Sequence, residues 1–228
     1  MDQKITNKKI IQLFKDNYPS TNFIDGLKIK YRALICPFID LLSHIPKDAK
    51  VGDIGCGSGQ FLLLASEFTE PSEVFGIEIS KRLIDNADSL FLNSGKKNFQ
   101  FEVYDGITFP EKLKEMDFIF LIDVLHHVPK DSQEDFLRKL CGQLKPGAKL
   151  VLKDIEAKSP LVIFNKIHDF IFAGEIGNEL SSNRVNELLR KNELEIISTS
   201  KRTMYVYPHY TIVAEKIRNR LNSLKINL

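Results

Sequence analysis

Short runs of β-branched and aromatic residues alternate with longer amphipathic stretches along most of the chain. The short runs predict five strands, which cover residues 50–54, 73–77, 99–103, 117–122 and 150–154. Between them, helical periodicity predicts helices over 59–68, 80–92 and 131–143. The run at 117–122 is apolar throughout, which is typical of a strand buried on both faces. This alternation predicts an α/β fold with a parallel sheet and helices on both faces.

The pattern differs on either side of this region. Helices are expected at 5–15 and 31–43 ahead of the first strand. After the fifth strand, residues 160–173 form an apolar helical stretch, and a helix capped by Ser181 or Ser182 is expected over 182–191. Two further strands near 193–201 and 205–215 predict a hairpin that closes the sheet. The tail, residues 216–228, has one apolar helical face.

The segment that points to chemistry is Val51–Gly59, with the sequence VGDIGCGSG, between the first strand and a helix. Glycines permit a tight turn and a close approach of backbone to ligand, and ligands of parallel sheets bind at this edge. A dinucleotide site is typified by GxGxxG, but the sixth position counted from Gly55 is Gln60. Asp53 would repel a pyrophosphate and suits a zwitterionic amino acid or a sulfonium. The alternative is a purely structural turn.

VGDIGCGSG resembles the first motif of the class I S-adenosylmethionine-dependent methyltransferases, and the resemblance extends over most of residues 50–155. The resemblance implies S-adenosylmethionine as the cofactor. It also implies a Rossmann-like, seven-stranded, mostly parallel sheet whose last strand is antiparallel, which the predicted C-terminal hairpin fits. One departure is Gly52, where the family usually carries a bulky apolar residue.

The resemblance also implies roles for the acids that end the second and third strands. Glu78 would bind both ribose hydroxyls, because a carboxylate can accept two hydrogen bonds from a diol. Asp105 would accept a hydrogen bond from the adenine amino group, with Ile79 against the ring and Gly106 and Ile107 at its border. Alternatively, both acids are solvated charges at strand ends.

Further cofactor contacts are implied near the methionine part. IDVLHHVP, residues 122–129, resembles the fourth motif of the family and places Asp123 there, unless Asp123 caps a turn. Tyr31 lies in a region that covers this part of the cofactor in related enzymes, unless it belongs to a helix packed on the sheet. The expected contacts in the loop are Asp53, Gly55, Cys56, Gly57 and Gly59.

Methyl transfer from a sulfonium is an in-line displacement that requires neither a metal nor a covalent enzyme intermediate. The protein contributes by holding nucleophile and methyl in a reactive geometry. A hydroxyl nucleophile would benefit from a base, and the candidates are His126, His127 and His168, the last beside Asp169. Structural roles are the alternative for all three. His209, in the aromatic run YVYPHY, is expected to serve packing.

Composition narrows the partners and the compartment. The 228 residues include 32 basic and 30 acidic side chains, a net charge of +2 that gives no electrostatic footprint for nucleic acid. Three cysteines without CxxC spacing predict neither disulfides nor a zinc site. The chain shows no signal peptide and no apolar stretch near the ~18 residues of a membrane span. We therefore expect a cytoplasmic protein.

These features predict one domain with four parts. Residues 1–45 are a helical cover, 46–155 the cofactor-binding core, 156–180 an insertion or lid, and 181–228 the completion of the sheet and the tail. The apolar insertion favours a small, hydrophobic methyl acceptor, and the tail allows weak contact with a membrane surface. The alternatives are a non-catalytic S-adenosylmethionine-binding scaffold and a nucleotide-linked oxidoreductase.

Overall fold

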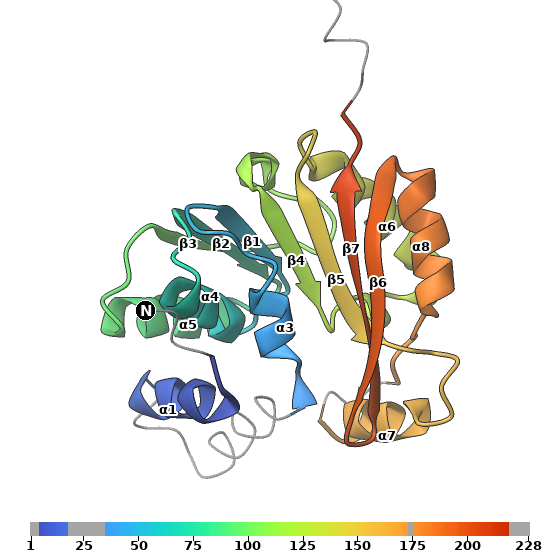
Figure 1. Ribbon diagram of the computed structural model, residues 1–228, viewed down its shortest axis with the longest axis horizontal. Helices are drawn as coiled ribbons and strands as arrows, with labels where there is room; N and C mark the ends of the chain where they lie inside the picture. The colour runs from blue at the N-terminus through green and yellow to red at the C-terminus, as the bar shows by residue number, and fades with distance from the viewer. Residues whose placement is uncertain (1–4, 18–34, 173–175, 219–228) are drawn as a thin grey trace, which may run out of the picture.

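Seven strands form a mixed sheet in the order β3-β2-β1-β4-β5-β7-β6 (Figure 1). The computed structural model describes residues 5–17, 35–172 and 176–218, without the side chains of residues 168, 169, 171 and 172. The parallel strands are β1 (Lys50–Ile54), β2 (Glu73–Glu78), β3 (Phe99–Val103), β4 (Phe118–Ile122) and β5 (Lys149–Ile155).

The C-terminal strands confirm the predicted hairpin. β6 (Leu194–Met204) and β7 (Tyr207–Lys216) are antiparallel to each other, and β7 also pairs antiparallel with β5. The described sheet is therefore the Rossmann-like one that the resemblance implied. Its strand order reverses between β1 and β4, and such a switch point opens a crevice at the carboxyl ends of the strands.

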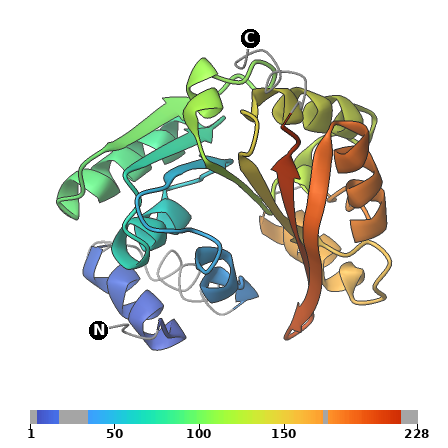
Figure 2. The same cartoon turned by 45° about the horizontal axis from the view of Figure 1, so that its top comes forward.

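Helices cover both faces of the sheet (Figures 1 and 2). The first face carries α1 (Asn7–Asn17), α3 (Phe38–Leu42), α4 (Gln60–Phe68) and α5 (Lys81–Asn93). The second carries the short 3-10 helix η1 (Glu111–Glu115), α6 (Gln133–Gln143) and α8 (Ser182–Lys191). Of the helix expected at 31–43, the structure shows α3 near its end, and residues 31–34 lie outside the described ranges.

Aromatic contacts join the helices of the first face to the sheet. The ring centroids of Phe14 and Phe38 are 6.5 Å apart, and those of Phe38 and Phe61 are 6.3 Å apart. Phe61 in turn packs on Phe120 of β4 at 4.6 Å. This chain of contacts places the N-terminal helices in the same core as β4. Aromatic pairs in edge or offset arrangements stabilise a fold beyond the effect of their buried area.

The insertion and its neighbours form short helices near the carboxyl ends of β4 and β5. Residues after β4 form η2 (Leu125–His127) and η3 (Lys130–Ser132), and the insertion forms α7 (Val162–Phe172). Ser181 caps α8 by accepting a hydrogen bond from the Arg184 backbone, as predicted. None of the described helices has the length and apolarity to cross a membrane. Residues 219–228 of the tail lie outside the described ranges.

Gly52 of β1, the departure from the family pattern, is explained by its neighbours. A Cβ atom on Gly52 would lie 3.1 Å from Cγ of Met116 and 3.3 Å from Cδ2 of Leu113. Both of these side chains are fully buried. Residues in and beside η1 therefore fill the space that a larger residue in β1 would occupy.

Gly76 of β2 is a second position where the packing requires glycine. A Cβ atom there would lie 2.6 Å from Cδ1 of Phe101 and 2.8 Å from Sγ of Cys56. Contacts this short force neighbours to move. Because Gly76 has no side chain, Cys56 of the glycine-rich loop can pack directly against β2.

We predict that Gly76→Ala lowers the free energy of unfolding by about 1–3 kcal/mol, the usual range for overpacking in a core. The matched control is Gly142→Ala in α6, where a Cβ would meet no atom within 4 Å. That change should raise stability by about 0.5–1 kcal/mol, because alanine is the better helix former. Urea denaturation measures both, and a stability of Gly76→Ala equal to that of the wild type would contradict the packing described.

Candidate functional site

The glycine-rich loop leaves β1 in a backbone conformation that residues other than glycine rarely adopt. Gly55, Gly57 and Gly59 have φ values of 71°, 54° and 75°. The backbone N–H groups of Gly55 and Cys56 donate to the carbonyl of Ile77, at 2.8 and 3.0 Å. A Cβ on Gly55 would also lie 2.4 Å from Cγ2 of Val124. The loop is thus held against β2 on one side and against the segment after β4 on the other.

A cavity of about 140 Å³ opens beside this loop. Its lining residues come from the loop, from the starts of α4 and α5 and from the end of β4: Asp53, Gly55, Cys56, Gly57, Ser58, Gln60, Phe61, Leu83 and Ile122. Asp53 is buried, and a Cβ on Gly57 would meet no atom within 4 Å. A ligand can therefore approach the backbone at Gly57 closely, next to a buried acid that favours positive charge.

Glu78 ends β2 beside the glycine-rich loop. One carboxylate oxygen accepts a hydrogen bond from the Gly57 backbone (3.2 Å), and the other accepts one from the Ser80 backbone (3.1 Å). These bonds hold the carboxylate beside the loop. Each oxygen has a second lone pair, so the group can still accept hydrogen bonds from a vicinal diol.

Asp105 follows β3 in a turn that its own side chain stabilises. Oδ1 accepts hydrogen bonds from the backbones of Thr108 and Ile107, both at 2.7 Å, and these bonds lower the pKa of the carboxyl. Ile79 and Ile107 are 68% and 65% exposed. Each of these residues closely follows one of the strand-end acids in sequence, so this region has exposed apolar surface and carboxylate acceptors. Gly106, in the same turn, has a φ of 81°.

Asp123 ends β4 with a φ of 56° and forms a partly buried ion pair with Lys153 of β5. The Lys153 ammonium lies 2.5 Å from Oδ1, and its side chain is 1% exposed. Burial opposes ionisation of Asp123, but the charge of Lys153 outweighs it and holds the pKa well below its usual range. The sequence does carry a signal for this pair, because a lysine inside the apolar run LVLKD is expected to be buried and to need an acidic partner.

His126 is also buried and is held by an acid that sequence reasoning missed. Its backbone N–H donates to Oδ2 of Asp154 (3.1 Å), and its ring Nδ1 lies 2.5 Å from Oδ1. Because an ionised carboxylate only accepts, Nδ1 carries the proton. His127 is exposed and packs on His126 with ring centroids 4.1 Å apart. The side chain of His168 and all of Tyr31 lie outside the described part of the chain.

Cys56 is buried in the loop beside two acids. Burial first, and then the charges of Asp53 and Glu78, raise the pKa of its thiol far above the usual range. A thiol that stays protonated is no nucleophile. Within the described residues, no group of three or more His, Cys, Asp or Glu side chains is placed to hold a metal ion.

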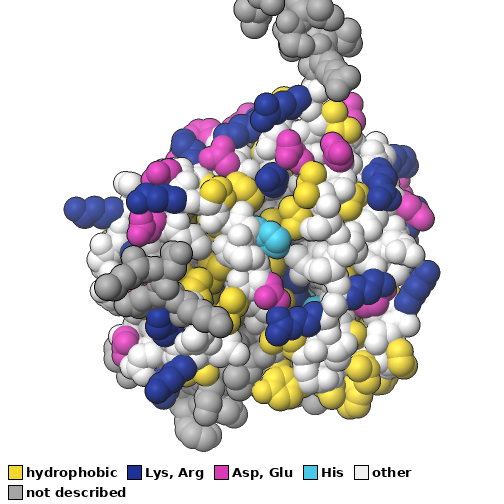
Figure 3. Space-filling model, in the orientation of Figure 1, with side chains coloured by type: hydrophobic (Ala, Val, Ile, Leu, Met, Phe, Trp, Pro, Cys, Tyr) yellow, Lys and Arg dark blue, Asp and Glu magenta, His cyan; other side chains and the backbone are white. Residues whose placement is uncertain are grey.

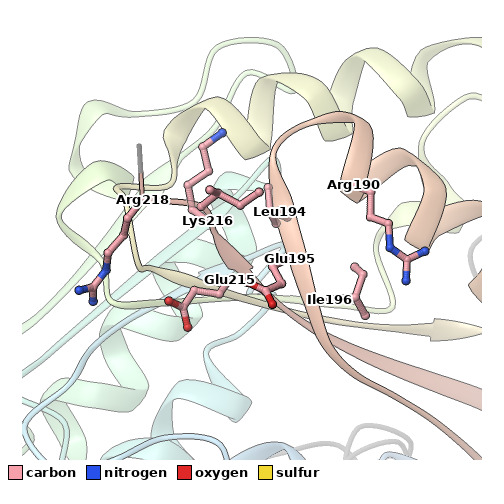
Figure 4. Close-up of a pocket in the computed structure, with 8 residues that line it drawn as sticks. Arg190, Leu194, Glu195, Ile196, Glu215, Lys216 and Arg218 are labelled. Carbon is pink, nitrogen blue, oxygen red and sulfur yellow. The ribbon is translucent and has the colours of Figure 1, made fainter. Parts of the chain in front are cut away.

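A second hollow, of about 620 Å³, lies at the opposite edge of the sheet, where β6 begins and β7 ends. It is lined by Arg190, Leu194, Glu195, Ile196, Glu215, Lys216, Ile217 and Arg218. The labelled charged groups there do not converge on one point (Figure 4). A binding site needs convergent polar groups. This hollow is therefore a weaker candidate for a ligand site than the cavity beside the glycine-rich loop.

Comparison with known sequences places the chain in a family. A family described as "Methyltransferase domain" matches residues 27–199. The chain is 24% identical over 181 residues to 27-O-demethylrifamycin SV methyltransferase of Amycolatopsis mediterranei, covering 72% of this chain and 60% of that protein. It is 26% identical over 114 residues to the Xenopus tropicalis tRNA (carboxymethyluridine(34)-5-O)-methyltransferase alkbh8, covering 50% and 16%. The chain thus spans less than two thirds of the length of either relative.

Solved structures show the same fold. Magnesium protoporphyrin IX methyltransferase from Synechocystis PCC 6803 with bound SAH aligns with a TM-score of 0.66 at 18% identity, over 92% of this chain and 95% of that one. A SAM-dependent methyltransferase from Aquifex aeolicus aligns with a TM-score of 0.63 at 18% identity, over 94% and 100%. With the family match over residues 27–199, the chain belongs to the methyltransferase-domain family, and its fold is that of these solved methyltransferases.

Proposed function

We propose that this protein is a class I S-adenosylmethionine-dependent methyltransferase, that it acts on a small, hydrophobic acceptor, and that α7 lies over the acceptor site. The observation that carries the proposal is the apolar surface of α7. Its side chains Ile163, Phe164, Ile167 and Phe170 are 51%, 44%, 50% and 64% exposed. Soluble proteins rarely leave so many large apolar side chains together on one element unless the surface binds something.

Two polar residues of α7 bond to the segment that follows the helix. Asn165 donates to one carboxylate oxygen of Glu179 (3.2 Å), and the ammonium of Lys166 lies 2.6 Å from the other. Lys166 also donates to the carbonyl of Gly177 (2.8 Å). A helix that only served the core would bury its apolar face instead. The anchoring of α7 therefore leaves its apolar side available for a ligand.

The position of α7 supports an acceptor role. It lies at the edge of the sheet where β4 and β5 end (Figure 1), and hydrophobic side chains gather over it at the lower right of the space-filling view (Figure 3). The backbone of Asn178 donates to the carbonyl of His126 (2.7 Å), and the side chain of Gln133 bonds the carbonyls of both Asn178 and Leu125. These bonds tie the segment after α7 to the loop that carries Asp123.

Each predicted cofactor contact receives a role in this proposal. The loop residues Asp53, Gly55, Cys56, Gly57 and Gly59 would hold the methionine part, together with Asp123 and Tyr31. Glu78 would hold the ribose, and Ile79, Asp105 and Gly106 the adenine. Bound S-adenosylmethionine supplies an electrophilic methyl group on a sulfonium. The carboxyl groups of Asp53 and Asp123 would favour that positive charge, and the fixed loop would orient it toward the acceptor.

Proton removal from the acceptor is the remaining task, and His126, His127 and His168 stay the proposed bases for a hydroxyl nucleophile. The relatives act, by their names, on 27-O-demethylrifamycin SV and on tRNA. A small-molecule acceptor is favoured here because a net charge of +2 gives no electrostatic footprint for a nucleic acid.

The first functional prediction concerns the close approach of ligand to the loop. Gly57→Ala should weaken binding of S-adenosylhomocysteine by about tenfold or more, equivalent to ~1.4 kcal/mol, because the methyl group enters the space that the ligand needs. Gly95→Ala is the matched control, since Gly95 also has a positive φ (66°) and an open Cβ position but lies after α5.

Both variants should lose about 1–2 kcal/mol of stability from the left-handed conformation. Calorimetric titration measures the affinity and urea denaturation the stability. Equal affinities in the two variants would contradict the close approach at Gly57.

The second prediction tests the function itself. The wild-type protein should transfer labelled methyl groups from S-adenosylmethionine to the apolar fraction of a cell extract separated by polarity. Phe164→Ser/Phe170→Ser should lower that transfer by about tenfold or more while S-adenosylhomocysteine affinity stays within about threefold, a change below ~1 kcal/mol. The control is Leu92→Ser/Ile197→Ser, because these side chains are also exposed, at 69% and 53%, but lie on α5 and β6.

Three results would contradict parts of this account. Label confined to polar fractions would refute the hydrophobic acceptor. Unchanged transfer by the double phenylalanine variant would refute the role of α7. Binding of S-adenosylhomocysteine without transfer to any fraction would support the non-catalytic alternative.

A further inference from the structure

His209 of β7 has one ring nitrogen that the described residues do not satisfy. The ring is buried, and Nε2 lies 2.8 Å from the carbonyl oxygen of Ile35. Because a carbonyl only accepts, Nε2 carries the proton, and Nδ1 of the neutral ring has a free lone pair. Nδ1 has no hydrogen-bond partner among the described residues. Burying such an atom unpaired is costly, so a partner is expected that the described residues do not supply.

His209 projects toward the face of the sheet that carries the cavity. Side chains alternate along β7, and Tyr210 belongs to the core beneath α6 and α8, so His209 points to the opposite face. On that face Ile122 lines the cavity, and Lys153 is its register partner on β5. β7 is the next strand after β5. On β7 the register partner of Lys153 is Thr211, so His209, the partner of Ile155, lies on the same face two residues farther toward the carboxyl end of β5.

The charges around His209 keep its ring neutral. Burial first, and then the charge of Lys153, lower the pKa of His209 to about 4, although Asp123 and Asp154 act in the opposite direction. On the edge strand, Arg202 is the register partner of His209 and forms an ion pair with Asp40 of α3. The ring stays unprotonated at neutral pH, and its Nδ1 remains an acceptor.

Tyr207 restricts the ring of His209 further. The two rings lie nearly parallel, at 17°, with centroids 6.2 Å apart. With the bond from Nε2 to Ile35, this contact fixes the direction of the Nδ1 lone pair. A fixed acceptor is suited to orienting a ligand rather than to packing alone.

We infer that Nδ1 of His209 accepts a hydrogen bond from the nucleophilic O–H or N–H group of the methyl acceptor. The inference rests on the proposed function and deepens it, since it names the class of acceptor. A carboxylate has no proton to donate to Nδ1. It would also meet the ionised Asp123, and Lys153 is already paired with that acid. The site is thus suited to a neutral hydroxyl or amine compound, and His209 orients its nucleophile.

Two substitutions separate this role from the anchoring of Ile35. His209→Gln places an amide nitrogen near the position of Nε2, which keeps a donor for Ile35 and removes Nδ1. His209→Asn places a carbonyl oxygen near the position of Nδ1 and gives up the contact with Ile35. His44→Gln, in the loop after α3, is the control for loss of a half-buried histidine elsewhere.

The measurement is transfer of labelled methyl from S-adenosylmethionine to a small-molecule cell extract, split by anion exchange into neutral compounds and carboxylates. Label should enter the neutral fraction. His209→Gln should lower that transfer by about tenfold or more, ~1.4 kcal/mol, at wild-type thermal stability and wild-type affinity for S-adenosylhomocysteine. His209→Asn should lose stability but retain more transfer per folded molecule, and His44→Gln should match the wild type.

The failures are distinguishable. No transfer by wild-type protein that binds S-adenosylhomocysteine removes the proposed function, and this inference with it. Transfer that His209→Gln leaves within threefold, or label confined to carboxylates, overturns the inference alone. If both variants fail to fold, nitrogen NMR of the histidines in the wild type decides, because a proton on Nδ1 of His209 at neutral pH would also overturn it.

Discussion

The site depends on how the chain leaves β1. Three glycines in left-handed conformation turn the backbone within five residues, and the carbonyl of Ile77 accepts two hydrogen bonds from that turn. Alanine or a larger residue would strain the turn, and at Gly55 it would also collide with Val124. The turn holds Asp53 and the open backbone of Gly57 beside the start of α4, which gives the cavity its walls.

Two buried acid–base pairs organise the neighbouring side of the site. Lys153 holds Asp123 ionised at the end of β4, and Asp154 fixes the backbone and ring of His126 in the segment that follows. Both partners come from β5, and they follow each other in sequence. They therefore project to opposite faces of the sheet. Removing one member of such a pair leaves a buried charge without its partner, which is costly. The pairs therefore hold the segments around the switch point of the sheet in fixed positions.

Much of the fold followed from the hydrophobic pattern, because buried strands and amphipathic helices leave periodicities that sequence shows directly. The hairpin and the Ser181 cap were predicted within a few residues. The partners Lys153 and Asp154 were not, since they depend on the register between β4 and β5. Gly76 was missed for a similar reason, because its close contacts come from β3 and from the loop. His209 was expected to pack, and only its bond to Ile35 shows which nitrogen is left over.

Titration with S-adenosylhomocysteine and, separately, with NAD is the most direct test of the cofactor site at the end of β1. The acid at Asp53 and the spacing of the glycines predict that S-adenosylhomocysteine binds and that NAD does not. A ligand present at 100 times its dissociation constant stabilises the native state by about 2.7 kcal/mol, so thermal unfolding in its presence gives a second readout. Stabilisation by NAD, with none by S-adenosylhomocysteine, would contradict the cofactor site described.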